Sequence, residues 1–284
     1  MSGRAATGLG VGAILLWSTL ASLTVLSGGL PPFQTTAVAF AIGATVIGLA
    51  AIARGRAGAM LPTPASLALG VYGLFGYHAL YFLALKSAPA VEANLINYLW
   101  PLLIVLFSAL LPGERLRWFH VAGAALGLAG AAILTLGGGT LALSWDYALG
   151  YGAAAGCALV WSSYSVASRL LASVPSESLA VSCLATSVLA CFCSLAFETW
   201  VAPSGPAAWT ALACLGLGPV GAAFLLWDIG MKQGDTSLLG VLAYASPILS
   251  TLLLVALDLA EPTWALAVAC VLMVVAAVIA TRGA

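Results

Sequence analysis

Long apolar runs alternate with short polar breaks along the whole chain. A helix that crosses a membrane needs roughly 20 mainly apolar residues, and the sequence offers ten runs of about that length. The strict alternation of polarity that marks barrel strands is absent from them. The pattern predicts an all-α integral membrane protein with transmembrane helices at residues 7–27, 33–53, 65–87, 91–111, 116–137, 147–171, 176–199, 207–232, 236–258 and 261–281.

The composition points to the same environment. Hydrophobic residues make up 63% of the chain and charged residues only 6%, whereas about a quarter of the residues in a soluble domain are charged. So few charges cannot cover a water-exposed surface, so we expect the chain to be surrounded by the lipid bilayer. The formal net charge is +0, which gives no reason to expect a nucleic-acid partner.

The basic residues predict the orientation in the membrane. Lysine and arginine are enriched in the loops on the cytoplasmic side. If the N-terminus is cytoplasmic, only Lys86 among the 9 basic residues lies outside. The opposite orientation reverses that distribution, so both termini are predicted to be cytoplasmic. The basic residues on the cytoplasmic side are then Arg4, Arg54, Arg56, Arg115, Arg117, Arg169, Lys232 and Arg282.

The two halves of the chain, residues 1–140 and 141–284, resemble each other. A shift of 146 residues aligns Gly70 with Gly216, Lys86 with Lys232, Tyr98 with Tyr244, Pro101 with Pro247 and Trp118 with Trp264. Each half holds five predicted spans, and an odd number inserts the second copy upside down. Such inverted repeats are common in secondary transporters, whose binding site lies between the halves near mid-membrane. The alternative is an ancient duplication in a structural or enzymatic membrane protein.

Several aromatic and polar residues lie in the middle of predicted spans. Aromatic residues of the membrane interface belong at span ends, and polar side chains avoid lipid. We therefore expect a central cavity walled by aromatic rings, with amide and hydroxyl groups that hold an ammonium or a carboxylate. For each ring, packing within the bundle is the alternative. The predicted lining residues are Trp17, Tyr77, His78, Tyr81, Asn94, Asn97, Tyr98, Trp100, Trp161, Tyr164 and Tyr244.

Two prolines lie inside the predicted fourth and ninth spans. Proline lacks an amide donor and presses on the carbonyl four residues earlier, so Pro101 loosens the carbonyl of Asn97. Pro247 does the same in the second half. Each is predicted to be a hinge for gating, with a static packing kink as the alternative.

His78 and Asp228 are ionisable residues within predicted spans. His78 either carries a proton near neutral pH or serves as a neutral hydrogen-bond partner of a tyrosine, which we favour. Asp228 precedes Lys232 by four residues, which predicts a local ion pair on one helix. A proton relay built on a carboxylate at mid-membrane is therefore not expected.

Motifs for catalysis or for an ATP-driven pump are absent from the sequence. There is no nucleotide-binding loop, no HExxH, no set of metal ligands and no evident Ser/His/Asp combination. We therefore expect neither an enzyme nor a metal or cofactor. Ten helices suffice to enclose a cavity, so a monomer is sufficient.

The stretch YHALYFLALKSAPAVEANLINYLWPLLIVLFSALLPGERL, residues 77–116, resembles the EamA branch of the drug/metabolite transporter superfamily. The shared features are a small-residue loop before a helix with a central proline, here Pro101, and the following turn at residues 112–115. The second copy is similar from Thr236 to Pro262, although its LAEPTW segment departs from that turn. Within the superfamily, NYLWP is similar to the bacterial aromatic amino acid exporters.

This resemblance implies a ten-helix inverted-repeat fold and export of small metabolites from the cytoplasm across the inner membrane, with no covalent cofactor. Together with the aromatic cavity, it predicts a secondary transporter for aromatic amino acids. The alternatives are an exporter of other amino acids or drugs, and a membrane sensor or intramembrane enzyme that transports nothing. Facilitated diffusion, proton antiport and uniport driven by the membrane potential all fit the sequence.

Overall fold

The computed structural model describes residues 1–137, 139 and 141–281, so Arg282 and the predicted repeat boundary at residue 140 lie outside the described residues. The first half contains α1 (Gly3–Trp17), α2 (Leu20–Leu26), α3 (Pro32–Ala53), α4 (Pro64–Val71), the π-helix η2 (Tyr72–Gly76), α5 (Tyr77–Ser87), α6 (Ala90–Asn97), α7 (Trp100–Ser108) and α8 (Trp118–Leu136).

The second half contains α9 (Ala148–Ser168), α10 (Leu179–Phe197), α11 (Pro206–Leu215), the π-helix η6 (Gly216–Ala222), α12 (Ala223–Gln233), α13 (Thr236–Leu242), α14 (Ala245–Ala256) and α15 (Trp264–Thr281). Short 3₁₀ turns are η1 (Ala57–Met60), η3 (Trp145–Tyr147), η4 (Arg169–Leu171) and η5 (Ser176–Ser178). None of the described residues forms a strand, and the prediction of an all-α fold is confirmed.

In the described part of the chain, 9 helical stretches are long and apolar enough to cross a membrane. The one predicted span not among those nine is the sixth, residues 147–171, which corresponds to the 21-residue helix α9. The sequence of α9 is more polar because it contains serine, tyrosine and tryptophan, and much of the helix is buried between its neighbours. A helix shielded from lipid in this way has less need of an apolar surface.

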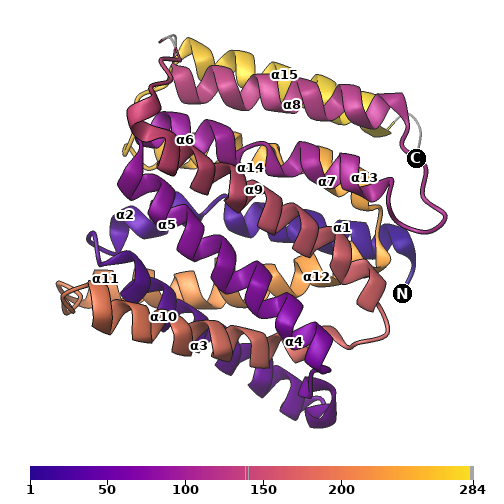
Figure 1. Cartoon of the computed structure of the whole chain (residues 1–284), viewed down its shortest axis with the longest axis vertical. Helices are drawn as coiled ribbons and strands as arrows, with labels where there is room; N and C mark the ends of the chain where they lie inside the picture. Colours follow the sequence, from indigo (N-terminus) through magenta and orange to yellow (C-terminus); the bar gives the residue numbers. More distant parts are fainter. Residues whose placement is uncertain (138, 140, 282–284) are drawn as a thin grey trace.

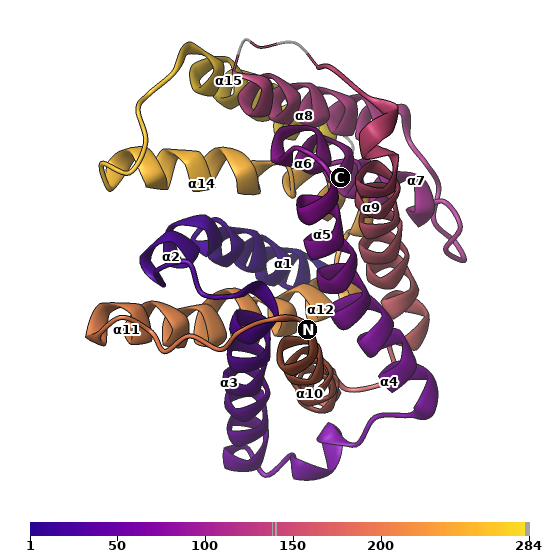
Figure 2. The ribbon, with the colours of Figure 1, turned by 60° about the vertical axis from the view of Figure 1, so that its left-hand side comes forward.

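Helices of the two halves pack in pairs. α3 packs against α10, α8 against α15, α1 against α12, α5 against α9, and α7 against α13. Two of these pairs, α8 with α15 and α3 with α10, lie at opposite edges of the bundle (Figure 1), as the turned view also shows (Figure 2). Exchanging the two halves leaves this set of pairs unchanged when whole spans are compared, as expected for two related repeats. The inversion of the second repeat in the membrane stays a prediction.

The third and fourth spans are irregular in both halves. The third spans contain η2 and η6, and the fourth spans are interrupted between α6 and α7 and between α13 and α14. Pro101 lies in the first turn of α7, where its missing N–H would have had no partner within the helix. Pro247 lies near the start of α14. The predicted kinks are therefore breaks that begin just before each proline, and their role as hinges stays a prediction.

Side chains from each half complete backbone hydrogen bonds in the other half. The Tyr244 hydroxyl donates to the Tyr98 carbonyl at 3.0 Å and accepts from the Leu102 N–H at 3.2 Å. These two backbone groups would bond to each other in a continuous helix. In the other direction, the Trp17 indole N–H donates to the Pro219 carbonyl inside η6 at 3.0 Å. Buried backbone groups need such partners, so the irregular spans hold the halves together.

The N-terminus and several loops predicted to be cytoplasmic meet at one end of the bundle (Figure 1). The backbone N–H of Asp235 donates to the Thr7 hydroxyl at 2.9 Å, and Arg56 forms a 2.9 Å ion pair with Glu177. Each contact joins segments that the charge distribution assigns to the same side. That this end faces the cytoplasm stays a prediction.

The Asp228–Lys232 pair lies inside the bundle. Their charged atoms are 2.8 Å apart, as the four-residue spacing predicts, and the Lys232 ammonium also donates to the Val174 carbonyl at 3.0 Å. Asp228 is only 3% exposed, although the sequence placed no acidic residue convincingly at mid-membrane. The four-residue spacing was sufficient to predict the ion pair. Its burial could not be predicted, because it depends on how α9, α10 and α12 pack.

Candidate functional site

A cavity of about 260 Å³ lies between the two halves. Its volume is just below the usual range of small-molecule sites, roughly 300–1,000 Å³, and so suits a single small ligand. All the predicted lining residues except Tyr164 border it, as do both predicted hinge prolines. The lining residues are Trp17, Leu20, Ala21, Tyr77, His78, Tyr81, Asn94, Asn97, Tyr98, Trp100, Pro101, Trp161, Phe224, Ala243, Tyr244, Ser246, Pro247 and Ser250.

Trp161 is the centre of the aromatic wall. Its ring centroid lies 5.6 Å from that of Trp17, 5.4 Å from Tyr77 and 6.4 Å from Trp100. The ring of Trp227 also belongs to this cluster, with its centroid 5.0 Å from that of Trp17 and 6.1 Å from that of Trp100. Edge-on and tilted ring pairs of this kind contribute about 0.5–1.5 kcal/mol each beyond their burial. The rings of the wall therefore brace one another.

A polar edge faces this wall. The rings of Tyr77 and Tyr81, one turn apart on α5, stack at 5.9 Å with an interplanar angle of 9°. The Tyr81 hydroxyl donates to Asn94 Oδ1 at 2.7 Å, and Asn97 Nδ2 donates to the Tyr77 hydroxyl at 3.1 Å. The two asparagines lie on successive turns of the same face of α6. The amides therefore fix the phenol rings in place.

Asn97 Oδ1 is a buried acceptor without a hydrogen-bond partner among the described residues. Asn97 is 4% exposed, and leaving such a group unpaired costs about 1–3 kcal/mol. Because Asn97 lines the cavity, a donor on a bound ligand can satisfy this oxygen. A buried unpaired acceptor calls for an explanation, and a bound ligand is one explanation for an acceptor whose residue borders the cavity.

His78 bonds to a carbonyl rather than to a tyrosine. Its Nδ1 lies 2.7 Å from the Leu74 carbonyl oxygen, and since a carbonyl only accepts, Nδ1 carries the hydrogen. The imidazole packs edge-on against Phe40 at 5.1 Å and Tyr77 at 5.4 Å. The expected tyrosine partner is therefore wrong, because the side chain turns back along its own helix.

Tyr164 does not reach the cavity. It follows Trp161 by three residues, which turns it about 60° around the helix. Its ring packs directly on Gly73 of η2, where an added Cβ would lie 2.2 Å from a ring carbon. It also borders a second, small cavity of about 20 Å³ beside the Asp228–Lys232 pair. The prediction that Tyr164 lines the central cavity is therefore wrong.

Tyr244 borders the cavity, but its hydroxyl is occupied by hydrogen bonds to the backbone of the fourth span.

The sequence patterns missed the apolar and small lining residues. Phe224 corresponds to His78 under the 146-residue shift, and Ala243 corresponds to Asn97. The repeat could therefore have identified both positions. The pairs also reveal an asymmetry, since the first half supplies the polar group and the second half an apolar one. The other missed residues are Leu20, Ala21, Ser246 and Ser250.

Comparison with known proteins gives close relatives. "Aromatic amino acid exporter YddG" of Ancylobacter novellus is 55% identical over 284 residues, which cover 99% of this chain and 98% of that protein. "Probable terminal-alkyne amino-acid exporter" of Streptantibioticus cattleyicolor is 33% identical over 93 residues, 31% of each chain. A solved crystal structure matches with a TM-score of 0.96 and 54% identity, covering 100% of this chain and 98% of the other.

The sequence pattern of the EamA-like transporter family matches twice, at residues 5–136 and 148–282. The two matches correspond to the two halves that pack in pairs around the cavity. Each half contributes a third span with a π-helix and a broken fourth span. The chain is a multi-pass membrane protein and belongs to the EamA-like transporter family.

Proposed function

We propose that this protein is a secondary transporter that exports aromatic amino acids and similar small aromatic compounds from the cytoplasm across the inner membrane. The single observation that carries this proposal is the cavity, whose lining combines the aromatic wall with Asn97, an amide with an unpaired Oδ1. The 55% identical relative, which is named as an aromatic amino acid exporter, supports the same substrate class.

The wall provides the surface for an aromatic side chain. A ligand ring that packs against Trp161, Trp17 or Tyr77 gains burial of its own apolar surface and an aromatic contact worth about 0.5–1.5 kcal/mol for each good pair. Because these rings already brace one another, binding does not require them to be ordered. Preorganisation of this kind lowers the entropic cost of association.

The polar edge holds the amino acid head group. Asn97 Oδ1 accepts a hydrogen bond from the ligand ammonium, which gives the ammonium a partner and removes the unpaired acceptor. The Asn94 amide oxygen is occupied by Tyr81, so its N–H groups are available to the ligand carboxylate. No charged protein group is needed for a zwitterion, because its own two charges lie side by side and compensate each other.

Transport requires the cavity to open alternately to the two sides. The proposed mechanism is an exchange of conformation between two inverted repeats, with bending at the interrupted fourth spans next to Pro101 and Pro247. Both termini are placed in the cytoplasm on the basis of the charge distribution. A monomer contains the whole cavity.

A second candidate is export of a non-aromatic amino acid. It is favoured by the partial match to the relative named as a probable terminal-alkyne amino-acid exporter. The head-group contacts would be shared, whereas the aromatic wall would contribute less to a small aliphatic side chain.

Competition for binding distinguishes the two substrate classes. Labelled tryptophan bound to the purified protein should be displaced by phenylalanine and tyrosine at concentrations about tenfold lower than by alanine or threonine, since two ring contacts contribute about 1–3 kcal/mol and about 1.4 kcal/mol corresponds to a factor of ten. Equal displacement by all four amino acids would favour the second candidate.

A further inference from the structure

One face of α9 runs from the cavity to the end of the bundle where the N-terminus lies. Trp161 forms the cavity wall, and Ser165, one turn further, accepts a hydrogen bond from the indole of Trp227 at 3.1 Å. Trp227 is 1% exposed and does not border the cavity. One more turn leads to Arg169, at the start of η4. We call the hydrogen-bonded pair Ser165 and Trp227 the floor of the cavity. The four-residue spacing thus places Trp161 in the wall, Ser165 in the floor and Arg169 along one face of α9.

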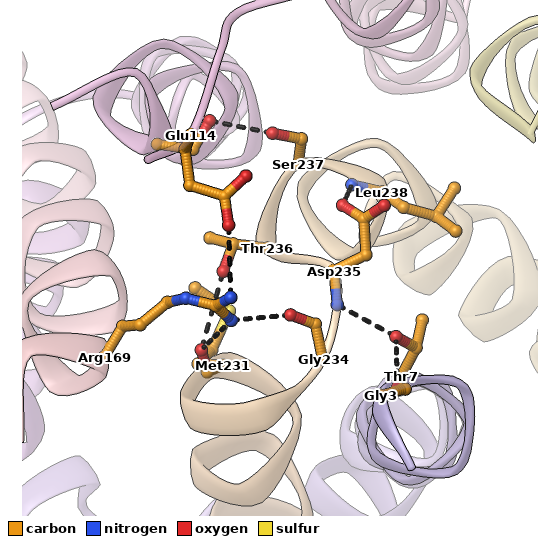
Figure 3. Close-up of polar contacts among 11 residues, drawn as sticks. Gly3, Thr7, Glu114, Arg169, Met231, Gly234, Asp235, Thr236, Ser237 and Leu238 are labelled. Atoms are coloured by element: carbon orange, nitrogen blue, oxygen red, sulfur yellow. Dashed lines mark hydrogen bonds and ion pairs between the residues drawn. The ribbon is translucent and has the colours of Figure 1, made fainter. Parts of the chain in front are cut away.

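Arg169 connects two loops that come from different halves (Figure 3). Its Nη1 donates to the Gly234 carbonyl at 2.6 Å and to the Met231 carbonyl at 3.3 Å, while Nη2 is 3.1 Å from Glu114 Oε1. The two carbonyls lie at the C-terminal end of α12, where backbone oxygens have no helical partner. The guanidinium therefore caps α12 and ties it to the turn that follows α7.

The turn between α12 and α13 is also bound to the first half (Figure 3). The Asp235 N–H donates to the Thr7 hydroxyl at 2.9 Å, and the hydroxyls of Ser108 and Ser237 are 2.8 Å apart. An added Cβ on Gly234 would lie 2.9 Å from the Thr7 backbone nitrogen. The turn is thus pressed directly onto α1, which leaves no room for a passage there.

We propose that Arg169, Glu114 and the turn between α12 and α13 form a lock that closes the cavity toward the cytoplasm, and that the lock opens to admit the substrate. This inference rests on the proposed transport function, and Arg169 acts in it as a positioning residue. The side chains of Arg169 and Glu114 are 27% and 40% exposed. Water can replace their contacts when they separate, so this ion pair can be released at little cost.

The lock has no counterpart in the other half. The repeat shift places Ala88 at the position of Gly234, Ala260 at that of Glu114 and Leu23 at that of Arg169. The turn that contains Ala88 packs on Gly150, where an added Cβ would lie 2.5 Å from the alanine side chain. Both turns therefore fit tightly against a helix, but only one carries an ionic clamp. The asymmetry favours a dedicated lock over a general packing motif.

Accessibility of the floor to a thiol reagent tests the lock without any substrate. A Ser165→Cys reporter would be placed in a chain whose less buried cysteines are replaced by alanine, and a membrane-impermeant maleimide would be applied separately to each face of oriented vesicles. The cysteines to be replaced are Cys191, Cys193, Cys214 and Cys270. Arg169→Gln should raise labelling from the cytoplasmic face about tenfold, because charge-assisted hydrogen bonds of this strength are lost. Glu114→Gln, which keeps the two carbonyl contacts, should raise it less.

The matched control is Arg54→Gln, which removes an exposed positive charge at the same end but no contact of the lock. It should label at the rate of the parent chain. Unchanged cytoplasmic labelling in folded Arg169→Gln and Glu114→Gln, or an increase from the outer face instead, would overturn the lock. Increased labelling of the Arg169→Gln variant, together with no amino acid transport by the parent chain, would keep the lock and reject the proposed function. The two failures are therefore distinguishable.

Discussion

Replacing Asn97 by alanine should weaken tryptophan binding while leaving the fold intact. The variant loses the acceptor that we assign to the ligand ammonium, and a hydrogen bond to a charged group contributes about 1.5–3 kcal/mol. At 1.4 kcal/mol per factor of ten, the dissociation constant should rise about 10- to 100-fold. The stability cost should be small. Only the 3.1 Å bond to Tyr77 is lost, at about 0.5–1.5 kcal/mol, and the buried unpaired Oδ1 disappears with it.

A pair of ligands isolates the contribution of the amino group. Calorimetric titration would compare tryptophan with 3-indolepropionate, which has the same ring and carboxylate but no ammonium. The parent protein should prefer tryptophan, and most of that preference should vanish in Asn97→Ala. Size-exclusion elution and thermal unfolding would establish that the variant is folded.

Asn94→Ala is the matched control, because its Oδ1 is already occupied by the Tyr81 hydroxyl. It should weaken both ligands to a similar extent and keep the preference for the amine. An unchanged tryptophan affinity in Asn97→Ala would refute the assigned contact. An equal loss for both ligands would show that Asn97 acts on the shape of the site rather than on the ammonium.

Three further substitutions test the packing that supports the site. Tyr244→Phe removes the hydroxyl that bridges the broken fourth span and leaves two backbone groups unpaired, so chemical denaturation or heating should show a loss of about 1–3 kcal/mol for each buried group; an unchanged unfolding midpoint would contradict this role. Asp228→Asn leaves the Lys232 ammonium buried without its counter-charge and should cost about 3–5 kcal/mol, whereas Asp228→Leu combined with Lys232→Met should restore most of the stability; a double variant as unstable as the single one would reject the charge argument. Gly73→Ala forces a methyl group against the Tyr164 ring and should cost about 1–3 kcal/mol, unless Tyr164→Ala relieves the contact, which thermal unfolding of both variants would reveal.

Much of the bundle could be predicted from the sequence, because each membrane-spanning helix is marked by an apolar run within its own segment. Each apolar run of about 20 residues must be a helix, and the repeat follows from a fixed shift. Kinks at Pro101 and Pro247 were also predicted, since proline acts on its own backbone. Most of the predicted cavity residues lie together because polar and aromatic groups at mid-depth turn away from lipid.

The remaining features depend on contacts between distant segments. The pattern gave no sign that the Tyr244 hydroxyl fills the gap beside Pro101, because the two residues lie in different halves. Tyr164 shares a helix with Trp161 but is turned toward Gly73, and a difference of 60° cannot be judged without the neighbouring helix. Arg169 was placed at the cytoplasmic end of the predicted span 147–171 by its charge, whereas its partners became apparent only with the chain folded.

Counterflow in liposomes tests the central claim most directly. Vesicles that contain the purified protein would be loaded with unlabelled tryptophan or phenylalanine, and the entrance of labelled amino acid would be followed with aromatic and aliphatic competitors outside. We predict transient accumulation of the label that phenylalanine and tyrosine abolish and that alanine and threonine leave unchanged. No accumulation by folded, correctly inserted protein would contradict the assignment as an exporter of aromatic amino acids.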